Sequence, residues 1–321
     1  MKRKRVVISE YIDPSGLDIL RGGADVLFLP DTTGLRLIDA VGEAHGLGVR
    51  VVRVTAELMD VARHLKVIAK HGVGYDNIDV AAATQRGIVV VTTPKANSIS
   101  VSEHIVALML GLANRVCAAD ADLKAGRFRK REDYIGVELK GKTLGVVGIG
   151  RIGSETVTKC RMGFGMNVIA YDPYVPPERF RTLGCERSDD LARVIGEADF
   201  LTLCVPLTAE TKGMLGAREL ALMKPTSFLI NTSRGGTVDE EALYGALVAG
   251  RLAGAGMDVF VDEPPTANHP LLSLDNFIAT PHVAGATVEA MRRMATDLAD
   301  EILRVFRGER PLYPVNPEVY T

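Results

Sequence analysis

Residues 148–153 read Gly-Ile-Gly-Arg-Ile-Gly and directly follow the apolar run 143–147. A second apolar run, 168–171, ends in Asp172, nineteen residues after the last of these glycines. A strand, a glycine turn, a helix and a second strand that ends in an acid form the order of a dinucleotide-binding unit. This order constrains the chain to an α/β fold, because two adjacent parallel strands need a helical crossover between them.

Each glycine of the turn has a separate expected role. Gly148 allows a tight turn, Gly150 lets the backbone approach a pyrophosphate, and Gly153 lets the helix pack closely on the strand. Arg151 and Ile152 begin the helix, whose N–H groups and dipole favour phosphate binding. Asp172 can accept hydrogen bonds from a ribose diol and would repel a 2′-phosphate, so the sequence predicts NAD rather than NADP.

Length and composition narrow the class of protein. A chain of 321 residues with 47% hydrophobic and 24% charged residues is typical of a globular protein with two domains. The net charge of −2 argues against nucleic acid as a partner. We expect no membrane span and no secretory leader, and the four cysteines form no CxxC pair. The sequence therefore predicts a cytoplasmic protein without a metal motif.

Two successive sets of short apolar runs alternate with helical segments, which predicts two doubly wound parallel sheets. The first set of expected strands is 6–8, 24–29, 48–52, 67–69 and 88–91, with a helix over 55–65 capped by Thr55. The second set is 144–147, 167–171, 200–204, 227–231, 254–257 and 277–279.

One long helix, expected over 98–125, lies between these sets, and a second, expected over 287–307, follows the second set. We predict a first domain of residues 1–98 plus 284–321 and an inserted dinucleotide-binding domain of residues 99–283. A cleft between two such lobes is a usual ligand site. The apolar face of the first long helix exceeds what one hinge needs, which favours a homodimer.

Three strand ends of the inserted domain carry side chains suited to proton transfer and anion binding. His282, Glu263 and Arg234 each follow an expected strand, and strand ends of this architecture face the ligand crevice. Histidine is the usual acid or base near neutral pH. Taken singly, the three could also be a loop histidine, a solvated turn residue and a salt-bridge partner. Their shared position favours a catalytic group.

Five segments resemble the D-isomer-specific 2-hydroxyacid dehydrogenase family, over nearly the whole chain and in the family's order. They are 70–79 (KHGVGYDNID), the glycine turn with Asp172, 231–236 (NTSRGG), 258–264 with its Asp-Val-Phe and Glu-Pro, and Pro281-His282. The similarity is greatest to phosphoglycerate dehydrogenase-like members. It implies a flavodoxin-like substrate domain with an inserted Rossmann domain. The chain length leads us to expect no C-terminal regulatory domain.

The resemblance implies a role for each matching residue. His282 would be the general acid/base, Glu263 would hydrogen-bond it and favour the imidazolium form, and Arg234 would bind the substrate carboxylate and its 2-oxygen. Backbone N–H groups of Val73 and Gly74 would hold the carboxylate, with Tyr75 beside them. The remaining cofactor contacts implied are Cys204, Val205, Pro206, Thr211, Thr232 and Asp258.

The substrate side chain stays open at this point. Arg50 is a candidate for binding a second anionic group, although nearby Arg53 could serve instead. His71 could add positive charge, or it could be a surface loop histidine. The sequence thus predicts an NAD-dependent enzyme that interconverts a small D-2-hydroxy acid and its 2-oxo acid. The alternative is an NAD(H)-sensing, corepressor-like protein that binds peptides.

Overall fold

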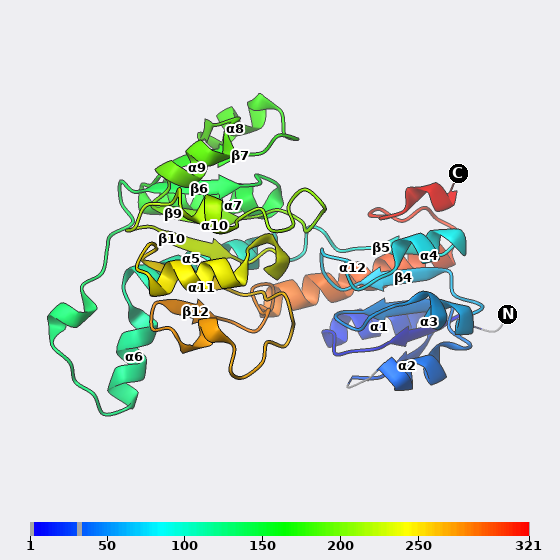
Figure 1. Ribbon diagram of the computed structural model, residues 1–321. Coiled ribbons are helices and arrows are strands. Elements are labelled where there is room, and N and C mark those ends of the chain that lie inside the picture. Colours follow the sequence, from blue (N-terminus) through cyan, green and yellow to red (C-terminus); the bar gives the residue numbers. More distant parts are fainter. Residues whose placement is uncertain (1–2, 31–33, 321) are drawn as a thin grey trace. The chain divides into compact units, whose positions relative to one another are not determined.

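A computed structural model describes residues 3–30 and 34–320, with side chains described from residue 37 onward after the gap. The chain divides into two compact units, unit 1 (Met1–Asn97 and Ala286–Thr321) and unit 2 (Ser98–Gly285). The predicted boundaries lie one and two residues from these divisions. Figure 1 shows a parallel sheet with its own helices in each unit.

Unit 1 is built on a five-stranded parallel sheet of order β2-β1-β3-β4-β5, the order of flavodoxin-like folds. Its strands are β1 (Arg5–Ile8), β2 (Asp25–Phe28), β3 (Gly46–Val49), β4 (Val67–Lys70) and β5 (Val89–Val91). Its helices are α1 (Pro14–Gly23), α2 (Gly34–Val41), α3 (Ala56–Val61), α4 (Val80–Gln85), α12 (Val288–Phe306) and the 3-10 turn η5 (Pro317–Tyr320).

Both faces of this sheet are buried. Val6 and Ile8 of β1 enter one apolar cluster with α1 and α12, while Val7 between them enters the cluster on the opposite face. The alternation follows from the two-residue period of a strand, and burial on both sides explains the continuous apolar runs. Helices α1 and α12 cross closely at Gly16, where a Cβ atom would lie 2.5 Å from the Ala295 carbonyl oxygen.

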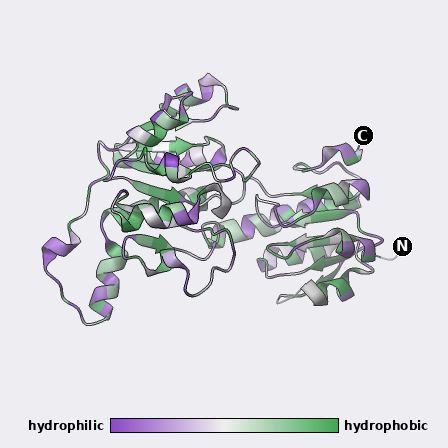
Figure 2. Cartoon of the chain, viewed as in Figure 1, coloured by the Kyte–Doolittle hydropathy of each residue, from purple (hydrophilic) through white to green (hydrophobic). Residues whose placement is uncertain are grey.

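Unit 2 holds a seven-stranded parallel sheet of order β12-β11-β10-β9-β6-β7-β8, in which β6 is flanked by β7 and β9 as in a Rossmann fold. Its strands are β6 (Thr143–Val147), β7 (Asn167–Tyr171), β8 (Glu186–Arg187), β9 (Phe200–Leu203), β10 (Phe228–Asn231), β11 (Gly254–Met257) and β12 (Phe277–Ala279). The two-residue edge strand β8 was not predicted. Figure 2 shows the strands of both sheets as predominantly hydrophobic ribbons.

The helices of unit 2, except the one over residues 116–124, cover both faces of that sheet, with one apolar cluster on each face. They are α5 (Ser98–Ala113), α6 (Val116–Lys124), α7 (Arg151–Thr158), α8 (Pro177–Leu183), α9 (Leu191–Glu197), α10 (Ala217–Leu220) and α11 (Glu240–Val248). Shorter helical turns are η1 (Arg131–Tyr134), η2 (Lys159–Gly163), η3 (Gly235–Thr237) and η4 (Pro270–Ser273).

The prediction of one continuous helix over 98–125 is wrong. Helices α5 and α6 meet at an angle of 65°, and Arg115 between them is left-handed with φ 52°. The Ala113 carbonyl accepts a 2.9 Å hydrogen bond from the Val137 N–H, so the returning chain caps the end of α5. No single helix within the described residues is long and apolar enough to cross a membrane.

Burial accounts for most of the apolar surface of α5, the first half of the predicted long helix. Most apolar residues of α5 pack inside unit 2, against α7 and strands β10, β11 and β12, while Ile99 is exposed. Ile105 and Met109 are fully buried there. Most of the apolar surface of this helix is therefore satisfied within one chain.

Candidate active site

The glycine turn between β6 and α7 has the geometry its sequence predicted. Gly148 has φ +91°, and a Cβ atom there would lie 2.6 Å from the Cys204 carbonyl oxygen. A Cβ atom on Gly153 would lie 2.0 Å from the Gly148 oxygen, so the first turn of α7 packs directly on the glycine turn. A Cβ atom on Gly150 would meet nothing within 4 Å. The backbone is thus open on the side where a pyrophosphate has to approach.

The acid that ends β7 lies beside this turn. One Asp172 carboxylate oxygen accepts from the Ile149 N–H at 2.9 Å and the other from the Tyr174 N–H at 3.0 Å. These bonds fix the carboxylate at the rim of the turn, and it stays partly exposed. A carboxylate has further lone pairs for ribose hydroxyls, so Asp172 fits the predicted adenosine side of the site.

The segment after β9 borders the same turn. The Cys204 N–H donates to the Val147 carbonyl at 2.8 Å, which brings residues 204–206 next to Gly148. Thr211 closes this loop through its hydroxyl, which donates to the Pro206 carbonyl at 2.6 Å. Cys204, Val205 and Pro206 therefore lie beside the glycine turn, and their contact with a cofactor stays a prediction. Thr211 has a structural task in the loop, and its contact with a cofactor stays a prediction.

A buried carboxylate shapes the turn that carries His282. Asp258 is 1% exposed, and it accepts hydrogen bonds at 2.8 Å from the backbone N–H groups of Val283 and Ala284. The Asp258 carbonyl accepts from the His282 N–H, also at 2.8 Å. His282 has φ 53°, a left-handed conformation that non-glycine residues rarely adopt. Both carboxylate oxygens of Asp258 thus accept hydrogen bonds from this turn. Contact of Asp258 with a nicotinamide stays a prediction.

The predicted acid/base pair is present. His282 Nδ1 lies 2.7 Å from Glu263 Oε2, and both side chains are partly exposed. Burial acts to raise the pKa of Glu263, but hydrogen bonds from His282 and from the Phe260 N–H, with the charge of Arg234, hold that pKa below its ordinary value. Glu263 is therefore an ionised acceptor, so Nδ1 carries the proton and Nε2 is the ring atom left for substrate.

The loop that carries Glu263 is braced from two sides. Glu263 Oε1 accepts from the Phe260 N–H at 3.0 Å, and Glu240 of α11 accepts from the Val261 N–H at 2.8 Å. Glu240 also pairs with His269 at 3.2 Å, and the His269 ring packs edge-on against Phe260. The backbone that sets the Glu263 carboxylate is thus fixed before any ligand binds.

Arg234 lies on a turn organised by Asn231 at the end of β10. The fully buried Asn231 accepts from the Ser233 N–H at 3.0 Å and donates to the Arg234 carbonyl at 2.9 Å. The next residue packs on the Glu263 loop, because a Cβ atom on Gly235 would lie 2.0 Å from the Phe260 carbonyl carbon. Arg234 and Glu263 therefore sit on two loops in direct contact. Thr232 lies at the start of this turn, and its cofactor contact stays a prediction.

The predicted substrate residues belong to unit 1. In the described part of the chain, the backbone N–H groups of Val73 and Gly74 have no hydrogen-bond partner. Val73 and Tyr75 are 38% and 44% exposed. Thr93 supports the preceding Gly72, whose N–H and carbonyl both bond to it. Two free donors on a supported turn fit the anion nest that the resemblance implies.

His71 differs from one of its two interpretations. It is 5% exposed, so it is not a surface loop histidine. Burial, followed by the nearby charge of Arg50, lowers the pKa of His71 to about 4. With this pKa the ring is neutral near pH 7. The surface-loop interpretation is wrong because a sequence position in a loop does not reveal how α12 covers it, and a contact between His71 and a substrate stays a prediction.

Arg50 belongs to a second turn of unit 1. The Glu10 carboxylate accepts from the backbone N–H groups of Arg50, Val51 and Val52 at 2.6 to 3.3 Å. The Arg50 guanidinium donates to the Tyr11 carbonyl at 3.3 Å. An internal acid thus fills this turn, leaving only the Arg50 side chain for a ligand.

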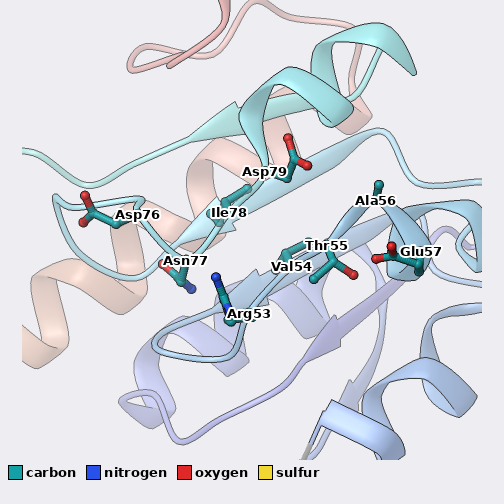
Figure 3. Close-up of a pocket in the computed structure, with 9 residues that line it drawn as sticks. All are labelled: Arg53, Val54, Thr55, Ala56, Glu57, Asp76, Asn77, Ile78 and Asp79. Atoms are coloured by element: carbon teal, nitrogen blue, oxygen red, sulfur yellow. The ribbon is translucent and has the colours of Figure 1, made fainter. Parts of the chain in front are cut away.

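Arg53, the alternative to Arg50, lines a hollow of about 430 Å³ formed by the segments that follow β3 and β4. Figure 3 shows Arg53 and Asn77 on one side of it, with Asp79 further along. Asn77 ties the two segments together by donating to the Val52 carbonyl at 2.6 Å. The alternative between the two arginines therefore remains open.

The sequence analysis missed four residues whose hydrogen bonds hold the turns that carry Arg234, Glu263 and His282. They are Asn231 under the Arg234 turn, Glu240 behind the Glu263 loop, and His104 with Thr280 under the His282 turn. Asn231 could have been found, because an asparagine two residues before a serine at a strand end favours an Asx turn. The other three act through partners distant in the chain, and no local pattern indicates them.

Taken together, unit 2 combines a nucleotide-binding Rossmann sheet with a histidine–carboxylate pair and an arginine at its strand ends. Residues 106–284, more than half of the chain, match the family model described as D-isomer specific 2-hydroxyacid dehydrogenase, NAD binding domain. The chain belongs to this family, and unit 2 is its NAD-binding domain.

Known relatives agree with this assignment. D-3-phosphoglycerate dehydrogenase from Methanocaldococcus jannaschii is 44% identical over 95% of this chain and 58% of the relative. The chain spans a little over half the length of that relative. The crystal structure of the TT0316 protein from Thermus thermophilus matches with a TM-score of 0.90 and 37% identity, over 97% of this chain and 99% of that one.

A second similar structure was solved with ligands. D-lactate dehydrogenase from Aquifex aeolicus, in complex with NAD and lactic acid, has a TM-score of 0.84 and 30% identity over 95% of this chain and 96% of that one. The Rossmann fold and the NAD prediction are therefore confirmed at the level of the family.

Proposed function

We propose that this protein interconverts a small anionic D-2-hydroxy acid and its 2-oxo acid. The observation that carries the proposal is the 2.7 Å contact between His282 Nδ1 and Glu263 Oε2 on the domain that binds NAD. When bound, NAD accepts or supplies the hydride. The fit for the cofactor lies in the open backbone face at Gly150 and in the placement of Asp172 beside the turn.

The residues of this chain then divide the remaining work. In the reductive direction His282 Nε2 gives a proton to the substrate oxygen as C2 receives a hydride. In the oxidative direction Nε2 removes the hydroxyl proton. Glu263 stabilises the charged imidazolium and holds the ring by its Nδ1 proton. Arg234 supplies a forked cation for the carboxylate and the developing negative charge on the 2-oxygen.

The substrate class follows from the free donors of unit 1 and from the relatives. The N–H groups of Val73 and Gly74 are proposed to bind the substrate carboxylate. The M. jannaschii relative is named for 3-phosphoglycerate and the A. aeolicus structure holds lactic acid. We propose phosphoglycerate, hydroxypyruvate or glyoxylate as the substrate, with an arginine after β3 binding any second anionic group.

A kinetic screen tests this proposal. NADH oxidation is measured with a panel of 2-oxo acids, with and without a phosphate group, and NADPH serves as the cofactor control. We expect turnover with NADH and preference for small anionic acids. Tight NADH binding with no turnover across the panel would contradict the proposal and favour the NAD(H)-sensing alternative.

Paired variants test which of the two arginines, Arg50 or Arg53, binds a second anionic group of the substrate. If one of them binds a substrate phosphate, its replacement by Gln raises KM for the phosphorylated acid about tenfold while KM for glyoxylate is unchanged. The other variant is the matched control. Equal KM values for all substrates in both variants would remove this part of the proposal.

We also propose that two copies of the chain associate through an arm formed by α6 and residues 125–137, which extends from the sheet of unit 2 (Figure 1). Asp122 ties the arm together by accepting from Arg127, Arg129 and Tyr134. Among its exposed charged residues the arm also exposes apolar side chains, with exposed fractions between 39% and 90% at Val116, Leu123, Phe128, Ile135 and Val137. Such a patch is typical of an interface.

Light scattering tests the dimer. A dimer is expected for the unmodified chain, and Phe128→Ser, at the most exposed of these apolar side chains, is expected to shift it toward monomer. A monomeric unmodified chain would contradict the proposal. The cytoplasmic location inferred from the sequence stays a prediction.

A further inference from the structure

The turn of residues 280–284 is connected to helix α5 by a chain of side-chain hydrogen bonds. His104 Nε2 of α5 lies 2.9 Å from Thr280 Oγ1, and Thr280 Oγ1 lies 2.6 Å from Asp258 Oδ1. Asp258 holds the backbone N–H groups of Val283 and Ala284. His282 lies in the sequence between Thr280 and Val283, which both bond to Asp258.

The direction of each bond follows from the chemistry of the groups. Two backbone N–H donors point at Asp258, so its carboxylate acts as an acceptor. The Thr280 hydroxyl has one proton and gives it to that carboxylate. Thr280 Oγ1 therefore accepts from His104, whose Nε2 carries a proton. The order of donation is His104 to Thr280 to Asp258.

Each member is placed so that it cannot easily rearrange. Asp258 is 1% exposed, and the His104 side chain is 21% exposed. Helix α5 packs on strands β10, β11 and β12, the last two of which end at Met257 and Ala279, directly before Asp258 and Thr280. A group fixed on rigid elements by buried hydrogen bonds is positioned more sharply than one on a free loop.

We propose that His104 and Thr280 are positioning residues that hold His282 for proton transfer through Asp258. The proposal rests on the proposed acid/base role of His282. The left-handed backbone of His282 needs support because the conformation is unfavourable for a side-chain residue. Asp258 supplies that support from both sides of His282, and Thr280 and His104 fix the carboxylate.

We call the chain of hydrogen bonds from His104 through Thr280 to Asp258 the relay. Paired variants test the relay by measurement of kcat. Thr280→Val keeps the shape and removes the hydroxyl, and we expect kcat to fall by about 10²-fold, the usual effect of a small misplacement of a catalytic group. Thr280→Ser keeps the hydroxyl and is expected to stay within about twofold. His104→Phe is expected to lose about tenfold and His104→Gln, which retains an N–H donor, to recover most of it. The NADH dissociation constant should be unchanged throughout.

The matched control is Thr182→Val. The Thr182 hydroxyl bonds only within α8, to the Glu178 carbonyl at 2.9 Å, and its loss is expected to leave kcat unchanged. The two His104 variants decide the question on their own if Thr280→Val does not fold. Wild-type kcat in both Thr280→Val and His104→Phe would overturn the relay, as would equal losses in Thr280→Val and Thr280→Ser.

A readout without turnover separates the two proposals. Nitrogen-15 NMR of histidine-labelled protein reports whether the His282 proton resides on Nδ1. We expect a single Nδ1-protonated signal in the unmodified chain and in Thr280→Ser, and a mixture of tautomers in Thr280→Val. An unchanged signal in Thr280→Val contradicts the relay. A changed signal in a chain that turns over no 2-oxo acid supports the relay and contradicts the proposed function.

Discussion

The two units place polar residues at the carboxyl ends of parallel strands, but they use them differently. In unit 2, His282, Glu263 and Arg234 have their partners already in place, from the Glu263–Phe260 bond to the Asn231 turn. In unit 1, the N–H groups of Val73 and Gly74 have no partner within the described residues. The strand ends of unit 2 thus carry side chains whose hydrogen-bond partners are already in place. The turn of unit 1 carries two N–H donors without a partner among the described residues.

A similar contrast exists within unit 1. The turn of residues 50–52 is filled by the Glu10 carboxylate, whereas the turn of residues 73–74 is not filled by any described group. Both turns offer consecutive N–H groups of the kind that bind anions. Glu10 supplies the anion for the turn of residues 50–52. The turn of residues 73–74 has no such anion among the described residues. This difference supports the proposal that the turn of residues 73–74 binds the substrate carboxylate.

The largest effect is expected at the strand ends of unit 2. His282→Ala removes the proton donor, and kcat for 2-oxo acid reduction should fall by about 10³-fold, within the usual range for general acid–base catalysis. NADH binding, followed by fluorescence titration, should be retained because the ring lies outside the glycine turn. Full activity in this variant would show that these strand ends are organised for something other than proton transfer.

The next prediction separates packing from ligand approach in the glycine turn. Gly153→Ala places a Cβ atom 2.0 Å from a backbone oxygen and should destabilise unit 2 by about 2 kcal/mol. Gly150→Ala meets nothing within 4 Å and should leave the thermal midpoint unchanged. NADH affinity of Gly150→Ala should nevertheless fall about tenfold, or about 1.4 kcal/mol, because the methyl group faces the pyrophosphate. Unchanged NADH affinity in this variant would place the pyrophosphate elsewhere.

His71 gives unit 1 a pH-dependent stability. Its pKa of about 4 is below the ordinary 6.5, so the unfolded chain binds a proton more readily. The corresponding stability, about 3 kcal/mol, is fully present above pH 6.5 and is lost as pH falls from 6.5 to 4. Urea unfolding at several pH values should show this loss, and His71→Gln should reduce it. The exposed His64→Gln is the control, and identical pH profiles for the unmodified chain and His71→Gln would refute the assignment.

Glu263→Gln tests the pairing of Glu263 with His282, and its expected effect on activity is smaller. The amide still accepts a hydrogen bond but no longer stabilises the imidazolium by its charge. Reduction, which needs the protonated ring, should then weaken first as pH rises, by about tenfold near neutral pH. The check is the pH profile of kcat in the unmodified chain and in Glu263→Gln. Coincident profiles would show that Glu263 does not act on His282.

Local patterns predicted the parts of the molecule that depend on near neighbours in the chain. The glycine turn, the strand before it and Asp172 lie within thirty residues, and each glycine has the geometry expected of it. Strands β7, β11 and β12 have the predicted bounds, because apolar runs between turn residues are a strong signal. His282, Glu263 and Arg234 were located from their place after such strands.

Features that depend on distant segments were missed or misjudged. The break between α5 and α6 is set by the return of Val137 to Ala113, and the burial of His71 depends on α12. The Glu10 carboxylate reaches residues about forty positions away. The Asp258 carboxylate bonds to residues 280–284, more than twenty positions along the chain, and these bonds were not predicted. Periodicity and spacing contain no information about these partners.

The most direct test is single-turnover oxidation of bound NADH by a saturating 2-oxo acid, measured across pH for the unmodified chain and for His282→Gln. Proton donation from Nε2 predicts a rate that declines as pH rises in the unmodified chain. It predicts a rate that is low and independent of pH in His282→Gln. A His282→Gln variant that keeps both the rate and its pH dependence would contradict the mechanism.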